Sequence, residues 1–284
     1  MELKHIATRE GPLWLILREE MKLSSGLMNR LKWQEKLFVN GAPEHTNFPV
    51  KPGDEISVIL DAPAPEYPAE QGDLTVLYED AYLLAVDKPA GMLIHPSRSC
   101  NTGTLANRVL GYYEKTGQNC AFHPVTRLDR DTFGIVLLAK NSHIHSVMQQ
   151  LNMEKTYHAL VLGCPAEAEG KIDMPIARKP LPSLLREIHP EGKPSVTEYR
   201  VLEDRGEVSV LELRPVTGRT HQLRVHCTYA GFPILGDPQY GREQTAEISR
   251  KMGWKTQALC AKRLEFLHPV TGKSMVLESE MDVI

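Results

Sequence analysis

The chain has 284 residues, of which 42% are hydrophobic and 24% are charged, and its formal net charge is −3. This length suits one large domain, or one large domain with a small one. The slightly acidic balance argues against a protein that coats nucleic acid nonspecifically, although it is compatible with one local basic groove that binds RNA.

The chain carries no signal that would take it into or across a membrane. No apolar run approaches the roughly 18 residues that a membrane helix needs. The N-terminal segment, MELKHIATREGPLWLILREE, carries acidic residues and lacks an uninterrupted apolar core, so it does not fit a secretory signal. Five separated cysteines without a CxxC pair favour reduced thiols and disfavour a zinc site. We therefore expect a cytoplasmic protein without a metal.

The N-terminal part predicts a helix followed by a hairpin. Ser24 and Ser25 begin the expected helix, and Leu27, Leu31 and Leu37 give it an apolar stripe. Asn40-Gly41 then predicts a tight turn, and a Pro-Gly turn precedes an alternating strand at residues 56–60. The basic residues in and beside this helix, Lys22, Arg30, Lys32 and Lys36, could grip RNA, or they could form an ordinary solvated face.

A segment rich in Pro, Ala and Glu, DAPAPEYPAEQG at residues 61–72, predicts a linker. It separates a small N-terminal unit from a larger C-terminal one. We set the boundaries at 1–62 for the small domain, 63–72 for the linker and 73–284 for the large domain.

The C-terminal part predicts an α+β fold with a mixed, mainly antiparallel sheet. Apolar alternation and short apolar runs predict strands at residues 74–80, 82–89, 134–140, 155–163, 195–204 and 207–216 and a hairpin at 259–278. Helical spacing predicts helices at residues 101–115, 142–153 and 220–231.

Two segments of this part carry candidate chemistry. RLDRDTFG, at residues 127–134, sets Asp129 between two arginines just before an apolar strand. VTGRTHQLRVH, at residues 216–226, sets Gly218-Arg219 before a helix rich in His, Gln and Arg. Taken alone, the first segment is more typical of a structural turn in which the Asp accepts backbone N–H groups, and the second is also typical of a loop before a partly buried polar helix.

Taken together and with DKPAGMLIHP at residues 87–96, these segments resemble the successive motifs of the RluA family of pseudouridine synthases. The family pattern Gly-Arg-Thr-His-Gln-Leu-Arg-Val-His is unbroken from Gly218 to His226, and it continues as AGFPILGDPQYG at residues 230–241. Lys155-Thr156-Tyr157 matches the family's strand that bears a tyrosine. The resemblance covers residues 73–284, and the N-terminal unit resembles the S4 RNA-binding module that often accompanies this family.

The resemblance has two departures. Thr126 stands where the family pattern has His, and Phe133 stands where it has Ser. Neither position carries the chemistry, so we expect them to affect the packing of the loop or the choice of substrate.

The resemblance implies that the protein isomerises uridine to pseudouridine in structured RNA, either large-subunit ribosomal RNA or transfer RNA, as a monomer without a cofactor. It implies that Asp129 is the catalytic carboxylate, and an ionised carboxylate needs a cationic partner if it is buried. The resemblance assigns that partner to Arg219, which predicts a salt bridge. Asp129 could act as a nucleophile or could abstract a sugar proton, and both routes stay open.

The remaining site residues follow the same motifs. Tyr157 is expected either to stack on the target base or to act as a base or relay for the C5 proton. A stacked uridine must be flipped out of its helix, and Arg127 could fill the vacated space or hold a phosphate. Leu223 is either an apolar wall for the base or helix core, and Arg224 and Arg130 are expected to contact the RNA.

Two other functions fit parts of the sequence. A noncatalytic RNA-binding or ribosome-assembly protein on the same scaffold would be compatible with the two departures. An acid-dependent hydrolase would use the carboxylate of Asp129, but a glycosidase normally needs a second carboxylate, and the sequence shows none at a recognisable position.

Overall fold

The computed structural model describes residues 2–61, 67–97 and 100–284. Most of the predicted linker, from residue 67 onward, lies within these ranges, and its first residues lie outside them. None of the helices within these ranges has the length and apolar character that crossing a membrane requires.

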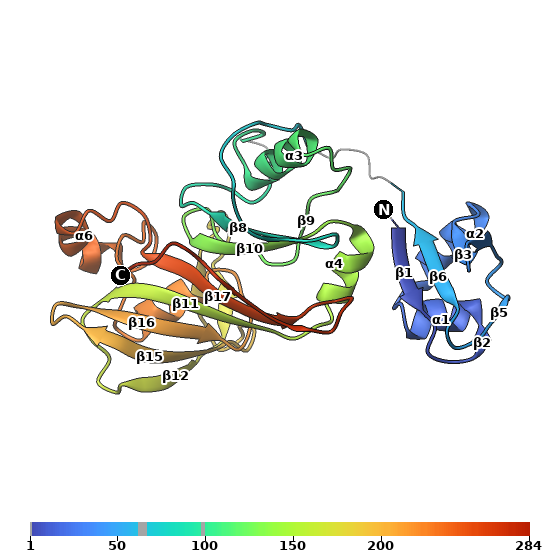
Figure 1. The fold of residues 1–284 in the computed structure, drawn as a ribbon. Coiled ribbons are helices and arrows are strands. Elements are labelled where there is room, and N and C mark those ends of the chain that lie inside the picture. The colour runs from blue at the N-terminus through green and yellow to red at the C-terminus, as the bar shows by residue number, and fades with distance from the viewer. Residues whose placement is uncertain (1, 62–66, 98–99) are drawn as a thin grey trace.

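The N-terminal unit is a four-stranded sheet packed on two helices (Figure 1). The sheet has the order β1-β6-β3-β4 and is formed by β1 (Glu2–Ile6), β6 (Glu55–Ile59), β3 (Leu37–Val39) and β4 (Ala42–Pro43). The helices are α1 (Leu13–Glu19) and α2 (Ser25–Trp33), and β2 (Gly11–Pro12) pairs with β5 (Pro49–Val50).

Local signals explain the elements of this unit. The side chain of Ser24 accepts the backbone N–H of Leu27 at 3.3 Å, so it is the N-cap of α2. Asn40 and Gly41 both have positive φ values, of 51° and 81°, as the tight β3–β4 turn requires. The predicted helix and hairpin are therefore present, whereas β1 and α1 were not predicted. The helix ends at Trp33, so Leu37 begins β3 and does not belong to the apolar stripe of the helix.

The large unit is built on a ten-stranded sheet with the order β12-β15-β16-β11-β17-β10-β8-β7. Its strands are β7 (Thr75–Glu79), β8 (Leu83–Lys88), β10 (Phe133–Ala139), β11 (Met153–Leu162), β12 (Glu169–Asp173), β15 (Val196–Asp204), β16 (Val208–Pro215) and β17 (Leu259–Leu267). Two further strands complete it, since β9 (His123–Pro124) pairs with β10, and β18 (Ser274–Glu278) pairs with β17. Only the β10–β17 pairing is parallel within this sheet, so the expected mixed, mainly antiparallel α+β fold is confirmed.

Helices cover both faces of the sheet. Strand β10 alternates, so that Val136 and Leu138 pack in the cluster beneath α3 (Leu105–Lys115), whereas Ile135 and Leu137 pack in the cluster beneath α4 (Ser142–Met148). A third cluster joins β11, β16 and β17 to α5 (Gln222–Tyr229) and α6 (Arg242–Lys251). The small hairpin of β13 (Ile176–Arg178) and β14 (Arg186–Ile188) packs near α5.

The two units contact each other at the edge of the large one. Tyr82 packs against the apolar core of the N-terminal unit. His143, on α4, makes a hydrogen bond with the backbone of Met21. Figure 1 shows the N-terminal unit beside α4, at the end of the large unit.

Candidate active site

Asp129 lies in the loop between β9 and β10, and contacts at both ends hold this loop against the sheet. The hydroxyl of Thr126 accepts the backbone N–H of Leu137 at 2.9 Å. The hydroxyl of Thr132 accepts a hydrogen bond from Gln257 Nε2 at 2.7 Å. The carboxylate is therefore presented by a backbone that is fixed on either side of it.

A buried lysine supports the middle of the same loop. Lys88 ends β8, is fully buried, and donates to the carbonyl oxygens of Pro89, Met92 and Arg130 at 2.9, 2.9 and 2.8 Å. Burial lowers the pKa of Lys88 to about 8, against the opposing pull of nearby carboxylates that include Asp129. The ammonium form still predominates at neutral pH, so the carbonyl oxygen of Arg130, the residue after Asp129, accepts a hydrogen bond from a charged donor.

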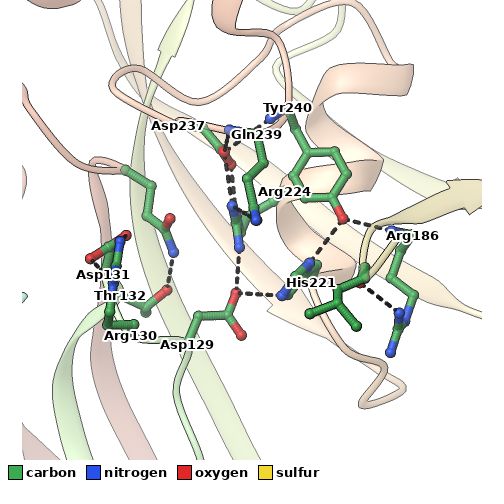
Figure 2. Close-up of polar contacts among 12 residues, drawn as sticks. Asp129, Arg130, Asp131, Thr132, Arg186, His221, Arg224, Asp237, Gln239 and Tyr240 are labelled. Atoms are coloured by element: carbon green, nitrogen blue, oxygen red, sulfur yellow. Dashed lines mark hydrogen bonds and ion pairs between the residues drawn. The ribbon is translucent and has the colours of Figure 1, made fainter. Parts of the chain in front are cut away.

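Arg224 is the cationic partner of Asp129. Its Nη1 donates to Asp129 Oδ2 at 2.9 Å, as Figure 2 shows. Its Nε and Nη2 donate to the two carboxylate oxygens of Asp237 at 2.7 and 2.8 Å, and Nη2 also donates to Gln239 Oε1 at 2.8 Å. Asp237 thus fixes the plane of the guanidinium, which presents its remaining N–H group to Asp129.

The burial of the three charged groups is graded. The side chains of Arg224 and Asp237 are 4% and 1% exposed, whereas that of Asp129 is 27% exposed. Burial lowers the pKa of Arg224, but its hydrogen bonds to Asp237 and the charges of both carboxylates outweigh burial and raise it. Arg224 is therefore a permanent positive charge, and Asp129 is the one of the two carboxylates that is open to a substrate.

The predicted salt bridge between Asp129 and Arg219 is wrong. Both residues are described by the structure, and no ion pair joins them. Arg219 is exposed, and its Nε donates to the carbonyl of Pro194 at 3.3 Å. Its backbone N–H donates to Gln222 Oε1 at 3.0 Å, so the residue belongs to the turn before α5. The loop turns Arg219 outward, and the first turn of α5 brings Arg224 to the carboxylate instead.

Tyr157 lies close enough to Asp129 for the negative charge of this carboxylate to act on the tyrosine hydroxyl. Burial raises the pKa of the Tyr157 hydroxyl well above its usual value, and the charge of Asp129 raises it further. A bulge in the β11–β17 pairing falls between Thr156 and Tyr157, and such bulges re-aim side chains beside active sites. The hydroxyl is protonated at neutral pH, so it would have to pass on its own proton before it could accept another.

The other expected substrate contacts separate into two groups. Arg127 and Arg130 are exposed on either side of Asp129, and Arg130 makes a bidentate ion pair with Asp131 at 3.0 Å. Leu223 is 7% exposed and packs in the core cluster of α5, which favours helix core over a wall for the base.

The two departures from the family pattern have packing roles. Thr126 holds the loop through the hydrogen bond to Leu137, as described above. Phe133 is 6% exposed and stacks on Trp254, with ring centroids 6.4 Å apart and planes at 15°.

A cavity of about 470 Å³ opens in front of Asp129. This volume falls in the range of small-molecule sites, about 300–1,000 Å³. Its wall combines the loop of Asp129, the segment after β8, the start of α5 and the loop that holds Asp237. It is lined by Leu93, Ile94, His95, Leu128, Asp129, Arg130, Asp131, His221, Arg224, Pro238, Gln239 and Gln257.

Sequence reasoning missed two parts of this site. His221 was not among the residues that the motifs assigned to the site, yet it lines the cavity, with its Nε2 3.9 Å from Asp129 Oδ2. Asp237 lies in a segment that matched the family pattern without an assigned role, yet it fixes the guanidinium of Arg224. The available signal was Asp237 itself, since an acid inside an otherwise apolar segment needs a cation when the fold buries it.

Comparisons with known proteins identify the family of the chain. The profile of the RNA pseudouridylate synthase family matches residues 82–229. A Bacillus subtilis protein named as an uncharacterized RNA pseudouridine synthase, YlyB, is 37% identical over 87% of this chain and 82% of that protein. Ribosomal large subunit pseudouridine synthase D of Haemophilus influenzae is 34% identical over 87% of this chain and 81% of that protein.

A solved structure of a protein with a pseudouridylate synthase domain has a similar fold. The human RNA pseudouridylate synthase domain containing 1 protein aligns with a TM-score of 0.61 and 26% identity, over 74% of this chain and 84% of that one. The matched profile includes the loop of Asp129, Tyr157 and the start of α5. The chain belongs to the RNA pseudouridine synthase family and is of its RluA type.

Proposed function

We propose that this enzyme converts a uridine of large-subunit ribosomal RNA to pseudouridine, with Asp129 as the essential carboxylate. The observation that carries the proposal is the ion pair of Asp129 with Arg224 at the mouth of a cavity of about 470 Å³. The substrate class is favoured by relatives named for the large ribosomal subunit, such as the Haemophilus influenzae protein.

The geometry suits either chemical route. The C1′–N1 bond of the uridine breaks, the uracil rotates, and C5 bonds to C1′ while the C5 proton leaves. Asp129 either bonds to C1′ as the C1′–N1 bond breaks and is displaced when C5 bonds to C1′, or it removes a sugar proton and returns it when the C5–C1′ bond forms. Arg224 keeps a positive charge beside Asp129 in both cases. The protonated hydroxyl of Tyr157 passes its proton to a neighbouring acceptor as it takes the C5 proton, and its ring stacks on the base.

We also propose that the N-terminal unit is an S4-like module that binds the RNA outside the cavity. The C-terminal half of α2 exposes Arg30, Lys32 and Trp33, and the Trp33 side chain is 83% exposed with Lys32 Nζ 5.9 Å from the centroid of its ring. Exposed aromatic and cationic groups together are typical of surfaces that stack bases and contact phosphates. Lys36, also expected there, is paired with Asp61. On this proposal the enzyme acts as a monomer in the cytoplasm.

Mapping pseudouridine in total RNA tests the substrate. We expect one or more sites in large-subunit ribosomal RNA to disappear when the gene is deleted and to return when it is restored. Loss of sites only in transfer RNA would overturn the ribosomal assignment and leave the activity standing. Restoring the gene with Lys32→Ala and Trp33→Ala should lower the occupancy of the same sites if the N-terminal unit binds the RNA, and unchanged occupancy would contradict that role.

A further inference from the structure

His221 stands at the edge of the cavity in a backbone conformation that histidine seldom adopts. It has φ of 57° and ψ of 18°, in the left-handed region, and it directly precedes α5. This conformation is unfavourable for a residue other than glycine. Residues held in such conformations often have functional roles, and His221 has contacts that show what the conformation achieves.

A chain of hydrogen bonds fixes the proton on the His221 ring. The backbone N–H of Arg186 donates to the hydroxyl oxygen of Tyr240 at 2.7 Å. This oxygen lies 2.8 Å from His221 Nδ1. Burial raises the pKa of Tyr240, so its hydroxyl is protonated at neutral pH. The hydroxyl accepts from Arg186, and His221 Nδ1 is the acceptor within reach of its own proton, so we assign the ring proton of His221 to Nε2.

Tyr240 is itself held firmly. It is 8% exposed, and its ring lies against the guanidinium of Arg224, whose Cζ is 5.0 Å from the ring centroid. Its backbone N–H donates to Asp237 Oδ1 at 3.0 Å. One segment therefore positions both Arg224, through Asp237, and His221, through Tyr240, as Figure 2 shows.

The Nε2–H of His221 is directed to the space beside the catalytic carboxylate. It lies 3.9 Å from Asp129 Oδ2, which is too far for a direct hydrogen bond. Any sugar carbon that reacts with Asp129 must approach this carboxylate closely. The 2-carbonyl oxygen of uracil and the 2′-oxygen of ribose both lie next to C1′, so either one would come within reach of His221.

We infer that His221 is a substrate-binding residue, which donates a hydrogen bond from its neutral ring to an oxygen of the target nucleotide beside C1′, and that Tyr240 is the positioning residue that sets its tautomer. This inference rests on the proposed function. Negative charge spreads onto the uracil oxygens when the C1′–N1 bond breaks, and a prepositioned donor stabilises such charge. The 2-carbonyl is therefore the acceptor that would gain most.

The charges around His221 favour the neutral ring. Burial lowers its pKa below the usual 6.5, and the charges of Arg224 and Arg186 lower it further, whereas those of Asp129 and Asp237 oppose this. The residue is therefore a donor whose protonation does not change between pH 7 and 8.

Two substitutions separate the donor from the fold. His221→Asn tolerates the left-handed backbone and can reach Tyr240, but it has no group at the position of Nε2. His221→Gln places an amide N–H near that position. We expect the single-turnover rate of tritium release from RNA labelled at uridine C5 to fall on the order of 10²-fold in His221→Asn. His221→Gln should keep more of the rate than His221→Asn, and Tyr240→Phe should lie between wild type and His221→Asn.

The substrate for this test is ribosomal RNA from cells that lack the gene, and thermal unfolding checks that each variant is folded. A His221→Asn rate equal to wild type would overturn the inference, as would a folded His221→Gln that is as slow as His221→Asn. If the wild-type rate changes with pH near 7 and this dependence disappears in His221→Gln, His221 acts as an acid or a base, and the inference of a neutral donor is overturned. If wild type itself releases no tritium, the proposed function fails instead. Short RNAs with a modified uridine at the mapped site identify the acceptor: 2-thiouridine lacks the 2-carbonyl oxygen, and 2′-deoxyuridine lacks the 2′-oxygen. The analogue that lacks the true acceptor should react at the same rate with wild type and with His221→Asn.

Discussion

Replacing Arg224 with Gln should destabilise the large unit and stop catalysis together. The side chain of Asp237 is 1% exposed and takes two hydrogen bonds from Arg224. Removing one partner of a buried ion pair costs about 3–5 kcal/mol, because the other charge is left buried without compensation. The same change deprives Asp129 of its cationic partner. Arg224→Gln should therefore lower the free energy of unfolding by about 3–5 kcal/mol and abolish measurable turnover.

Arg219→Gln is the matched control, because its exposed guanidinium makes one hydrogen bond of 3.3 Å to the Pro194 carbonyl. We expect it to change stability by about 0.5 kcal/mol or less. Urea unfolding measures both variants, and fluorescence reports the large unit alone when Trp14 and Trp33 are replaced with Phe, since Trp254 is then the remaining tryptophan.

Two results would refute this reasoning. One is a larger loss of stability or activity in Arg219→Gln than in Arg224→Gln. The other concerns the double variant Arg224→Gln/Asp237→Asn, which should regain part of the stability because the unpaired buried charge is gone. A double variant less stable than Arg224→Gln would show that the buried charge of Asp237 was not the cause.

Three further outcomes follow from single contacts. Tyr157→Phe should leave KM nearly unchanged and lower turnover by about 10²-fold or more, and steady-state kinetics with full turnover would contradict the relay role. Lys88→Met leaves three carbonyl groups without their donor, so urea unfolding should show a loss of at least about 2 kcal/mol, and a smaller change would show that water replaces the ammonium. Hydrogen bonds from His5, Thr8 and Arg9 outweigh the burial that opposes them and hold the pKa of Glu20 at about 2, against 4.5. Glu20 should thus stabilise the N-terminal unit by up to about 3 kcal/mol above pH 5, and this contribution should disappear as the pH falls toward 2. Urea titrations across this range should show the free energy of unfolding falling with pH in wild type and no such fall in Glu20→Gln.

Patterns within one segment predicted the elements of this fold well. Alternation along β10 and helical spacing along α3 identify which side chains are buried, because each pattern is set by local geometry. Weaker patterns were missed: α6 is polar over most of its length, and β13 and β14 have only three residues each. Such elements form because the rest of the domain packs against them.

The pairing of charges could not be predicted in the same way. The motif from Gly218 to His226 contains two arginines, Arg219 and Arg224, and nothing in their spacing shows which one meets a carboxylate 90 or more residues away. The choice depends on the left-handed turn at His221, which starts α5 and turns Arg224 inward. The resemblance located the motif, and the three-dimensional arrangement decides the partner.

The central claim is that Asp129 is the essential carboxylate of a pseudouridine synthase, and one comparison tests it most directly. Wild type, Asp129→Asn and Asp173→Asn are each incubated with ribosomal RNA from cells that lack the gene, and pseudouridine is then mapped. Asp173 is an exposed carboxylate at the end of β12 and serves as the control. We predict pseudouridine at the same site with wild type and Asp173→Asn and none with Asp129→Asn. Pseudouridine formed by Asp129→Asn at the wild-type rate would contradict the account.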